Sequence, residues 1–303
     1  MKAIIMDGYG GPDVLRLGDA ANPVPAENQV LIRVMAIGVN PADFKWRAGM
    51  FASFAPLTFP HIPGYDIAGI VEEAPPSAAV GKGARVAAML DNMRQGAYAQ
   101  YAVADAENLA VLPEGMDFAQ AVAVPTPGLT GMQLADEHLD VQPGQIILIT
   151  GTTGAVGRFA LWAAKRRGAQ VIAAVRASQR ATAKALGADV VLTLGEEDWT
   201  GGTIDGVGDI VGGAAVAALC RRVSADGRIF TAATTPIPAG GLAVHPVFFP
   251  VHPDGQQLAT LLQLVAKGEI SAPVAKTMKL RDAGEAQRMV EAGGIGGKLV
   301  LVP

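Results

Sequence analysis

A glycine-rich stretch at residues 151–157 constrains the fold of this chain more than any other feature, because a strand-like run precedes it and a helix-like run follows. The apolar run 146–149 before it is typical of a strand buried on both faces. After it, apolar residues recur at helical spacing up to Gly168, which suits a helix C-terminal cap. Glycines let the backbone approach a pyrophosphate closely, and the amides at a helix start favour its negative charge. The pattern predicts a dinucleotide-binding turn.

The glycine spacing alone does not identify such a site, because it reads GxxGxxG rather than GxGxxG. An ordinary strand-to-helix turn is the alternative. A second buried-strand run at residues 171–175 follows about one crossover later, as a strand–helix–strand unit requires. The predicted cofactor-binding residues of the turn are Gly151, Thr153, Gly154, Ala155, Val156 and Gly157.

The end of the second strand distinguishes between the two nicotinamide cofactors. A site for NAD places an Asp or Glu there, about 20 residues past the glycines, to accept from the ribose hydroxyls. No acidic residue occurs from Gly157 through Ala188, and the strand runs into Arg176, Ser178 and Arg180. These side chains are suited to hold a 2′-phosphate, so the sequence predicts NADPH. The alternative is a solvated basic start to a helix.

Composition narrows the function classes. The chain has 303 residues, of which 50% are hydrophobic and 17% charged, with a net charge of −4. Basic residues are scattered rather than gathered in a stripe, which argues against nucleic-acid binding. No apolar run reaches membrane-spanning length, and Asp7 interrupts the N-terminus before a secretory core forms. With Cys220 as its one cysteine, the chain is expected to be a cytosolic (cytoplasmic) enzyme without a disulfide or a cysteine-bound zinc.

The chain divides by pattern into two domains of an α/β protein. Residues 1–122 are predicted to form short strands between Gly and Pro turns, giving a mostly antiparallel, barrel-like domain. Residues 123–268 alternate strand and helix, including a helix that Asp254 would cap, which predicts a doubly wound parallel sheet of the Rossmann type. Residues 269–303 are expected to return to the first domain. Two crossings between domains would leave a cleft, where ligands prefer to bind.

Five further segments give the chain a family resemblance. They are residues 10–15 (GGPDVL), 39–43 (VNPAD), 63–69 (PGYDIAG), 96–101 (GAYAQY) and 297–301 (GKLVL). With the nucleotide turn, they make the chain resemble the medium-chain dehydrogenase/reductase superfamily, and within it the zinc-independent quinone oxidoreductases related to zeta-crystallin. The resemblance implies a GroES-like catalytic domain beside the Rossmann domain, and a homodimer.

The same resemblance bears on the metal. Zinc-dependent members carry a Cys in the second of these segments, a His-Glu pair in the third and four further cysteines in a lobe. This chain has Asn40 and Asp43 in the second segment, Tyr65 and Asp66 in the third, and no lobe cysteines. The resemblance therefore implies no metal ligands, and hydride transfer from NADPH to a polarised acceptor, either a quinone or an α,β-unsaturated carbonyl compound.

The resemblance also assigns site residues. Asn40 would face the nicotinamide end, and relatives often have a tyrosine where this chain has Phe51. The second proton would then come from water, Tyr65 or Tyr98, so that Asn40 and Tyr65 are the candidate catalytic residues. Further cofactor contacts are expected at Asn40, Thr130, Thr231, Phe249, Val251 and Lys298.

Two rival functions remain open at this stage. One is an NADPH-binding protein without turnover, with a structural or regulatory role, and the other is an enoyl reductase for thioesters. Among the polar residues near Asn40, the cluster of Asp43, Lys45 and Arg47 is expected to form a structural ion pair that involves Asp66. Phe248 and Phe249 are predicted to be core or dimer-interface residues.

Overall fold

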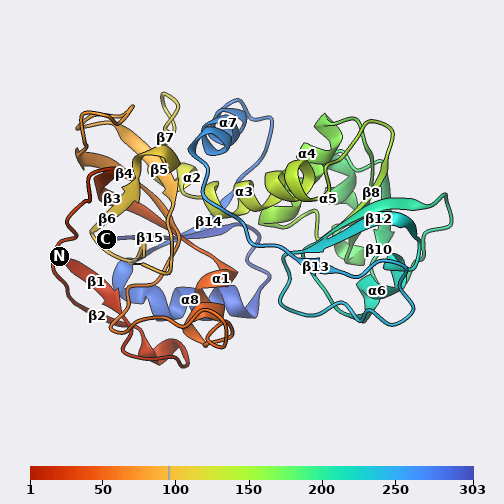
Figure 1. Cartoon of the computed structure of the whole chain (residues 1–303), viewed down its shortest axis with the longest axis horizontal. Coiled ribbons are helices and arrows are strands. Elements are labelled where there is room, and N and C mark those ends of the chain that lie inside the picture. Colours follow the sequence, from red (N-terminus) through yellow and green to blue (C-terminus); the bar gives the residue numbers. More distant parts are fainter. Residues whose placement is uncertain (95) are drawn as a thin grey trace. The chain divides into compact units, whose positions relative to one another are not determined.

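The structure is a computed structural model that describes residues 1–94 and 96–303, and the chain divides into two compact units (Figure 1). Unit 1 comprises Met1–Thr126 and Pro253–Pro303, and unit 2 comprises Pro127–His252. The strands are β1 (Lys2–Ile5), β2 (Arg16–Asp19), β3 (Gln29–Val39), β4 (Asp66–Glu73), β5 (Arg85–Met89), β6 (Tyr101–Asp105), β7 (Ala110–Val111), β8 (Ile146–Thr150), β9 (Gln170–Val175), β10 (Val190–Thr193), β11 (Ile204–Asp209), β12 (Val223–Thr231), β13 (Val247–Phe248), β14 (Val274–Lys279) and β15 (Lys298–Val302). The helices are α1 (Pro41–Arg47), α2 (Phe118–Ala121), α3 (Pro125–Gln133), α4 (Ala155–Arg166), α5 (Arg180–Ala185), α6 (Ala214–Cys220), α7 (Gly255–Ala266) and α8 (Ala283–Ala292), with short 3-10 turns at Pro12–Val14, Ala106–Asn108, Ala177–Gln179 and Leu280–Asp282.

Unit 2 is built on a parallel sheet of six strands in the order β10-β9-β8-β11-β12-β13. The chain starts at a central strand, moves to one edge and then returns to the other half, which is the doubly wound Rossmann order. Successive residues of each strand face opposite sides. Thus Ile147 and Ile149 pack with α4, while Leu148 packs with α6 on the other face. Both faces are covered, as the continuous apolar runs predicted.

Unit 1 contains a seven-stranded sheet in the order β14-β15-β3-β4-β5-β7, with β6 also paired to β3. All of its pairs are antiparallel except β14 with β15. The C-terminal strand β15 lies beside β3, with Leu299 opposite Val39. Figure 1 shows the same return of the chain, because blue C-terminal elements stand among red and orange N-terminal ones. Residues 269–303 thus belong to unit 1, together with Met1–Thr126.

The helix α7 lies in unit 1, whereas the sequence pattern placed it within the nucleotide domain of residues 123–268. Its N-cap is as expected, since the Asp254 carboxylate accepts from the backbone N–H groups of Gln256 and Gln257. A Cβ at Gly255 would lie 2.3 Å from the backbone oxygen of Glu107. The first residue of α7 therefore sits directly on the unit 1 backbone, a contact that helical periodicity does not encode.

The helix α1 was not expected from the sequence. Asn40 caps it: its backbone N–H donates to Asp43 Oδ2 at 2.8 Å, and Pro41 occupies the first helical position. At seven residues, the helix is too short to show a repeating apolar pattern. The predicted ion pair is wrong, because the buried Arg47 donates to Gln287 Oε1 and pairs with Glu291 instead.

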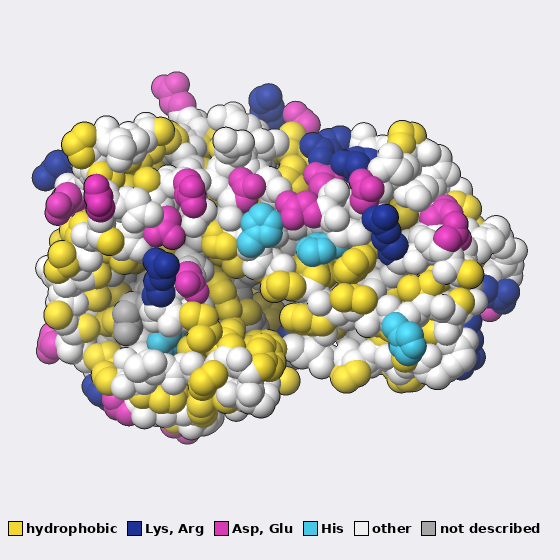
Figure 2. All heavy atoms as spheres, in the orientation of Figure 1, with side chains coloured by type: hydrophobic (Ala, Val, Ile, Leu, Met, Phe, Trp, Pro, Cys, Tyr) yellow, Lys and Arg dark blue, Asp and Glu magenta, His cyan; other side chains and the backbone are white. Residues whose placement is uncertain are grey.

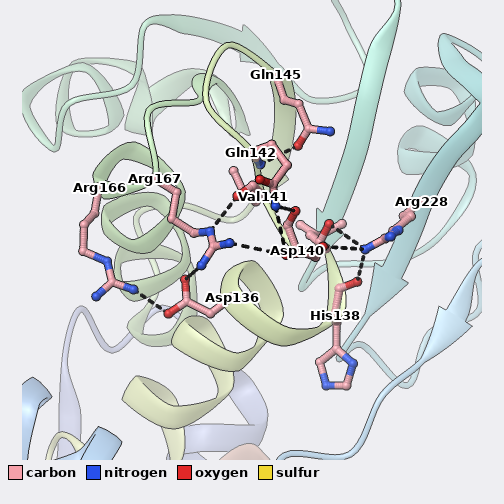
Figure 3. Close-up of polar contacts among 10 residues, drawn as sticks. Asp136, His138, Asp140, Val141, Gln142, Gln145, Arg166, Arg167 and Arg228 are labelled. Atoms are coloured by element: carbon pink, nitrogen blue, oxygen red, sulfur yellow. Dashed lines mark hydrogen bonds and ion pairs between the residues drawn. The ribbon is translucent and has the colours of Figure 1, made fainter.

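A π-helical turn at Leu134–His138 follows α3, and the ion pairs and hydrogen bonds drawn in Figure 3 hold it in place. Arg166 Nη2 lies 2.5 Å from Asp136 Oδ2, and Arg167 Nε donates to the backbone oxygen of Val141 at 2.6 Å. Arg228, from β12, donates to the oxygen of Leu139 at 3.1 Å. These contacts join the turn to α4 and to the sheet.

On the face drawn in Figure 2, acidic and basic side chains are interspersed. Among the described residues, no helix combines the length and the apolar character needed to cross a bilayer. The glycine turn and the polar residues near Asn40 remain as the candidate functional regions.

Candidate functional site

The glycine turn joins β8 to α4 in unit 2 and brings backbone atoms very close together. Gly151 has a φ of +61°, in the left-handed region, and its N–H donates to Ala174 O on β9 at 2.9 Å. A Cβ at Gly157 would lie 2.2 Å from Gly151 O and 2.7 Å from Thr152 Cα. The first turn of α4 can pack this tightly on the preceding loop only because position 157 is a glycine.

The start of α4 has the features of an anion-binding site. Its cap is Gly154, which has no side chain to accept from the first-turn amides. Thr152 is fully buried in the turn, and its Oγ1 has no hydrogen-bond partner. Arg158 donates to Thr153 O at 2.9 Å and to Gly154 O at 3.2 Å, which fixes the turn from the helix side. The turn therefore offers N–H donors and the positive end of a helix dipole, which are the groups that a dinucleotide pyrophosphate would need.

A buried aspartate links the carboxyl ends of three parallel strands through hydrogen bonds. Asp209, at the end of β11, accepts from Thr150 Oγ1 at 2.7 Å and from Thr231 Oγ1 at 2.6 Å. It also accepts from the backbone N–H groups of Val211 and Gly212, each at 3.0 Å. The hydroxyl of Thr231, a predicted cofactor contact, thus donates to Asp209. The network holds the sheet edge at which nucleotides bind in this type of fold.

The residues after β9 that were predicted to hold a 2′-phosphate differ in exposure and in their contacts. Arg176 and Ser178 are exposed, and Arg176 Nε donates to Gln179 Oε1 at 3.4 Å. Arg180 differs from Arg176, because its Nη1 forms an ion pair with Glu197 and donates to Thr193 Oγ1 at 2.9 Å. Glu197 was not among the residues predicted from the sequence.

Three other predicted cofactor residues lie in unit 2. Thr130 is buried on α3, beside Gly131, where a Cβ would lie 2.7 Å from Val156 O of α4. Phe249 is also buried, with its ring 4.4 Å from that of His138 between centroids. The Phe249 side chain therefore packs in the core, which agrees with one of its two predicted roles. Val251, two residues further on, is half-buried.

In unit 1, Asn40 belongs to a buried polar cluster with Asp66 and Lys298. Asn40 Nδ2 donates to Asp66 Oδ2 at 2.8 Å, and Lys298 Nζ donates to Asn40 Oδ1 at 2.5 Å and to Asp66 Oδ2 at 2.9 Å. Asp66 Oδ1 accepts from the N–H and the hydroxyl of Thr126, at 2.9 and 2.6 Å. Asp66 is fully buried, and together with Lys298 it orients the Asn40 amide, Asp66 at the amide nitrogen and Lys298 at the amide oxygen.

A second buried carboxylate, Asp43, contacts the backbone of Asn40. Its Oδ2 accepts from Tyr98 OH at 2.8 Å, in addition to the Asn40 N–H, while its buried Oδ1 has no hydrogen-bond partner. Burial raises the pKa of Asp43 from 3.8 to about 7. Tyr98 is fully buried as well, and its pKa is also raised by burial. These two groups lie in the protein interior.

Tyr65 is half-buried, and burial together with the nearby Asp43 raises the pKa of its phenol. The phenol therefore stays neutral at physiological pH and can donate a hydrogen bond. Phe51, where relatives often have a tyrosine, has its ring 5.0 Å from that of Trp46 and 5.7 Å from that of Phe54, between centroids. This apolar cluster lies next to exposed Met50.

The polar cluster does not fit a metal ion. Among the described residues, no three His, Cys, Asp or Glu side chains lie together as ligands. The Lys298 ammonium lies within 2.5 Å of Asn40 Oδ1 and 2.9 Å of Asp66 Oδ2, so a cation already occupies the oxygen atoms that a metal would use. A divalent ion added beside Lys298 would meet electrostatic repulsion.

Several residues that form hydrogen bonds or ion pairs with the predicted site residues were not predicted from the sequence. Thr150, Asp209 and Glu197 were not singled out, and Asp43 was assigned to an ion pair that does not form. Polar residues at the carboxyl ends of neighbouring parallel strands meet at one edge of the sheet. Applied to the ends of the predicted strands, this rule would have predicted that Thr150, Asp209 and Thr231 lie close together.

Two family models match the chain. The alcohol dehydrogenase GroES-like domain matches residues 26–114, and the zinc-binding dehydrogenase domain matches residues 186–301. Together with the two sheets, they confirm the predicted combination of a GroES-like domain and a Rossmann-type domain.

Individual relatives agree with these matches. The quinone oxidoreductase of Sus scrofa is 40% identical over 174 residues, which cover 57% of this chain and 52% of the relative. The matched part thus spans about half the length of this curated relative. The structure of the quinone oxidoreductase from Coxiella burnetii is 30% identical, with a TM-score of 0.88, and covers 100% of this chain and 99% of that one. A mycobacterial protein solved in complex with NADPH is 28% identical, with a TM-score of 0.84 and full coverage of both chains.

Proposed function

Because the chain belongs to the quinone oxidoreductase family of the medium-chain dehydrogenase/reductase superfamily, we propose that it reduces a quinone or an α,β-unsaturated carbonyl compound with NADPH, without zinc. The observation that carries the proposal is the turn at Gly151 and Gly157, followed by a strand end that bears Arg176 and Arg180 and no carboxylate before residue 189. When bound, the cofactor supplies the hydride.

The residues of unit 2 bind and orient the dinucleotide in this proposal. The amides of Ala155, Val156 and Gly157 donate to the pyrophosphate, and the absence of a Cβ at position 157 keeps the turn closed. The other predicted contacts in this unit are Thr130, Thr153, Thr231, Phe249 and Val251. Since the Phe249 ring is buried, its contribution comes from the backbone.

The 2′-phosphate is assigned to the residues after β9. Arg176 and Ser178 are exposed there, and half-exposed Arg180 begins α5. Each charge-assisted hydrogen bond to the phosphate contributes about 1.5–3 kcal/mol. The mycobacterial relative that was solved with NADPH is consistent with this choice of cofactor.

The cluster of unit 1 supplies the polar groups of the reaction. Lys298 and Asp66 hold the Asn40 amide, which we assign to the nicotinamide end of the cofactor together with Lys298. Reduction of a quinone by hydride also requires one proton. Tyr98 does not supply it directly, because it is buried and donates to Asp43, so Tyr65 or water remains as the donor.

Zinc independence is supported by the same cluster, because the Lys298 ammonium already contacts Asn40 Oδ1 and Asp66 Oδ2, the oxygen atoms that a metal would use.

We also propose a cytosolic homodimer. An exposed apolar edge strand is a typical protein–protein contact, and Val247 and Phe248 of β13 are 49% and 50% exposed. Elution in size-exclusion chromatography at the mass of two chains tests the dimer.

The experiment is an absorbance assay of NADPH or NADH oxidation with a naphthoquinone and with a simple enone. We expect the double variant Arg176→Ala/Arg180→Ala to raise the NADPH KM about tenfold to hundredfold while the NADH KM stays within about twofold. Equal losses with both cofactors would refute the phosphate assignment. A preference for NADH, or no turnover with any acceptor, would refute the proposed reaction.

The same assay distinguishes the two rival functions. Tight NADPH binding without turnover would favour a structural or regulatory role, for which the apolar Phe51 cluster, lacking a hydroxyl, is the supporting observation. Turnover with thioester enones alone would favour an enoyl reductase.

A further inference from the structure

The two arginines assigned to the 2′-phosphate have different electrostatic surroundings. Arg176 donates to the side chain of Gln179. Because Gln179 is neutral, this contact does not neutralise the positive charge of Arg176. Arg180 Nη1 pairs with the Glu197 carboxylate and donates to Thr193 Oγ1 at 2.9 Å. Only Arg180 is therefore partly neutralised.

Glu197 is held in place independently of Arg180. Its Oε2 accepts from the backbone N–H of Thr193 at 2.5 Å, and its own N–H donates to Thr193 O at 3.0 Å. These contacts anchor the carboxylate at the end of β10, the strand adjacent to β9 in the sheet. The bond from Thr193, with that from Arg180, lowers the pKa of Glu197, so the carboxylate is charged at neutral pH.

We propose that Glu197 determines cofactor specificity by holding and neutralising Arg180, which weakens the preference of the site for a 2′-phosphate over a 2′-hydroxyl group. The inference rests on the proposed function, since it assumes that NADPH binds at Arg176 and Arg180. Glu197 is then a positioning residue that acts through Arg180.

The direction of the effect follows from charge. A 2′-phosphate carries close to two negative charges, and it must either displace Glu197 from Arg180 or bind beside a like charge. A 2′-hydroxyl meets neither cost. Because the Thr193 N–H keeps Glu197 in place, the carboxylate does not move away when Arg180 turns to the phosphate. Removing the charge of Glu197 should strengthen binding only of a nucleotide that carries a 2′-phosphate.

The test measures equilibrium binding of adenosine 2′,5′-bisphosphate and of AMP to the full chain by calorimetry, without turnover. Glu197→Gln retains an oxygen that accepts from Thr193 N–H and removes the charge. We expect it to tighten bisphosphate binding about fivefold to tenfold at low salt and to leave AMP within about twofold, with a steeper salt dependence. Glu196→Gln is the matched control, because Glu196 is an exposed neighbouring acid.

Coupling to Arg180 completes the test. In an Arg180→Ala background, Glu197→Gln should change bisphosphate binding by less than about twofold. Unchanged or weaker bisphosphate binding by Glu197→Gln alone would overturn the inference, as would an equal gain in Glu196→Gln.

Failure of the inference is distinguishable from failure of the proposed function. If Arg176→Ala and Arg180→Ala weaken bisphosphate binding while Glu197→Gln has no effect, only the role of Glu197 is wrong. If wild type binds the bisphosphate no more tightly than AMP, and neither arginine variant changes this, the NADPH assignment fails and the inference fails with it.

Discussion

Lys298 and Asp66 form a buried ion pair in unit 1, with 2.9 Å between Nζ and Oδ2, although they lie 232 positions apart in the sequence. Their side chains are 5% and 0% exposed. The pair exists because β15 returns to β3, which places the start of β15 and the start of β4 on either side of the end of β3. It fixes the Asn40 amide, and it supports the absence of a metal in the proposed function.

Lys298→Met should destabilise the protein by about 3–5 kcal/mol, because it leaves Asp66 buried and without its counter-charge. Urea unfolding followed by circular dichroism measures the loss. Adding Asp66→Asn should restore part of the stability, and Lys279→Met, at an exposed position of β14, is the control. A Lys298→Met protein as stable as wild type would contradict the assigned role of the pair.

Asp43 should make stability depend on pH. Its pKa is raised from 3.8 to about 7, so the folded state binds the proton more tightly than the unfolded state. The contribution of Asp43 to the free energy of unfolding is therefore full below pH 3.8 and falls as the pH rises through about 7. Relative to wild type, Asp43→Asn should gain stability over this interval, because it carries no charge at any pH.

The measurement for Asp43 is urea unfolding at a series of pH values, with Glu27→Gln as an exposed control. Parallel stability curves for wild type and Asp43→Asn across that interval would refute the prediction. Tyr98→Phe, which removes the hydroxyl that donates to Asp43 Oδ2, should lower stability by about 1 kcal/mol or more.

Gly157→Ala should abolish most nucleotide binding, because its Cβ would lie 2.2 Å from Gly151 O and force the turn to open. We expect the NADPH Kd to rise at least about tenfold, measured by quenching of tryptophan fluorescence, while circular dichroism remains close to wild type. Gly240→Ala is the control, since a Cβ there meets nothing within 4 Å. Unchanged affinity in Gly157→Ala would show that the turn does not hold the cofactor.

Asp209→Ala should destabilise unit 2 by about 3–5 kcal/mol, because four donors from three strand ends lose their shared acceptor. Thermal unfolding reports the loss, and proteolysis of unit 2 should accelerate with it. Asp226→Asn, at an exposed position of β12, is the control. If Asp209→Ala unfolded at the wild-type temperature, the network would carry little of the stability of the sheet edge.

The sequence by itself determined the doubly wound sheet, the glycine turn and the choice of family, because these depend on local properties. Buried parallel strands require continuous apolar runs such as 146–149, and the sharp turn requires glycine at 151 and 157. The position of Arg176, Ser178 and Arg180 after β9 also follows from sequence, because the apolar run that forms the strand ends at Val175.

Tertiary structure alone decided which side chains meet across long separations. The packing of α7 on unit 1, the pair of Lys298 with Asp66 and the pair of Arg180 with Glu197 each join segments that share no periodic pattern. The expected ion pair of Asp43 failed for the same reason, because burial left that carboxyl facing Tyr98 rather than a cation. Periodicity fixes which face of an element is buried, whereas the partner on that face depends on how the chain folds back.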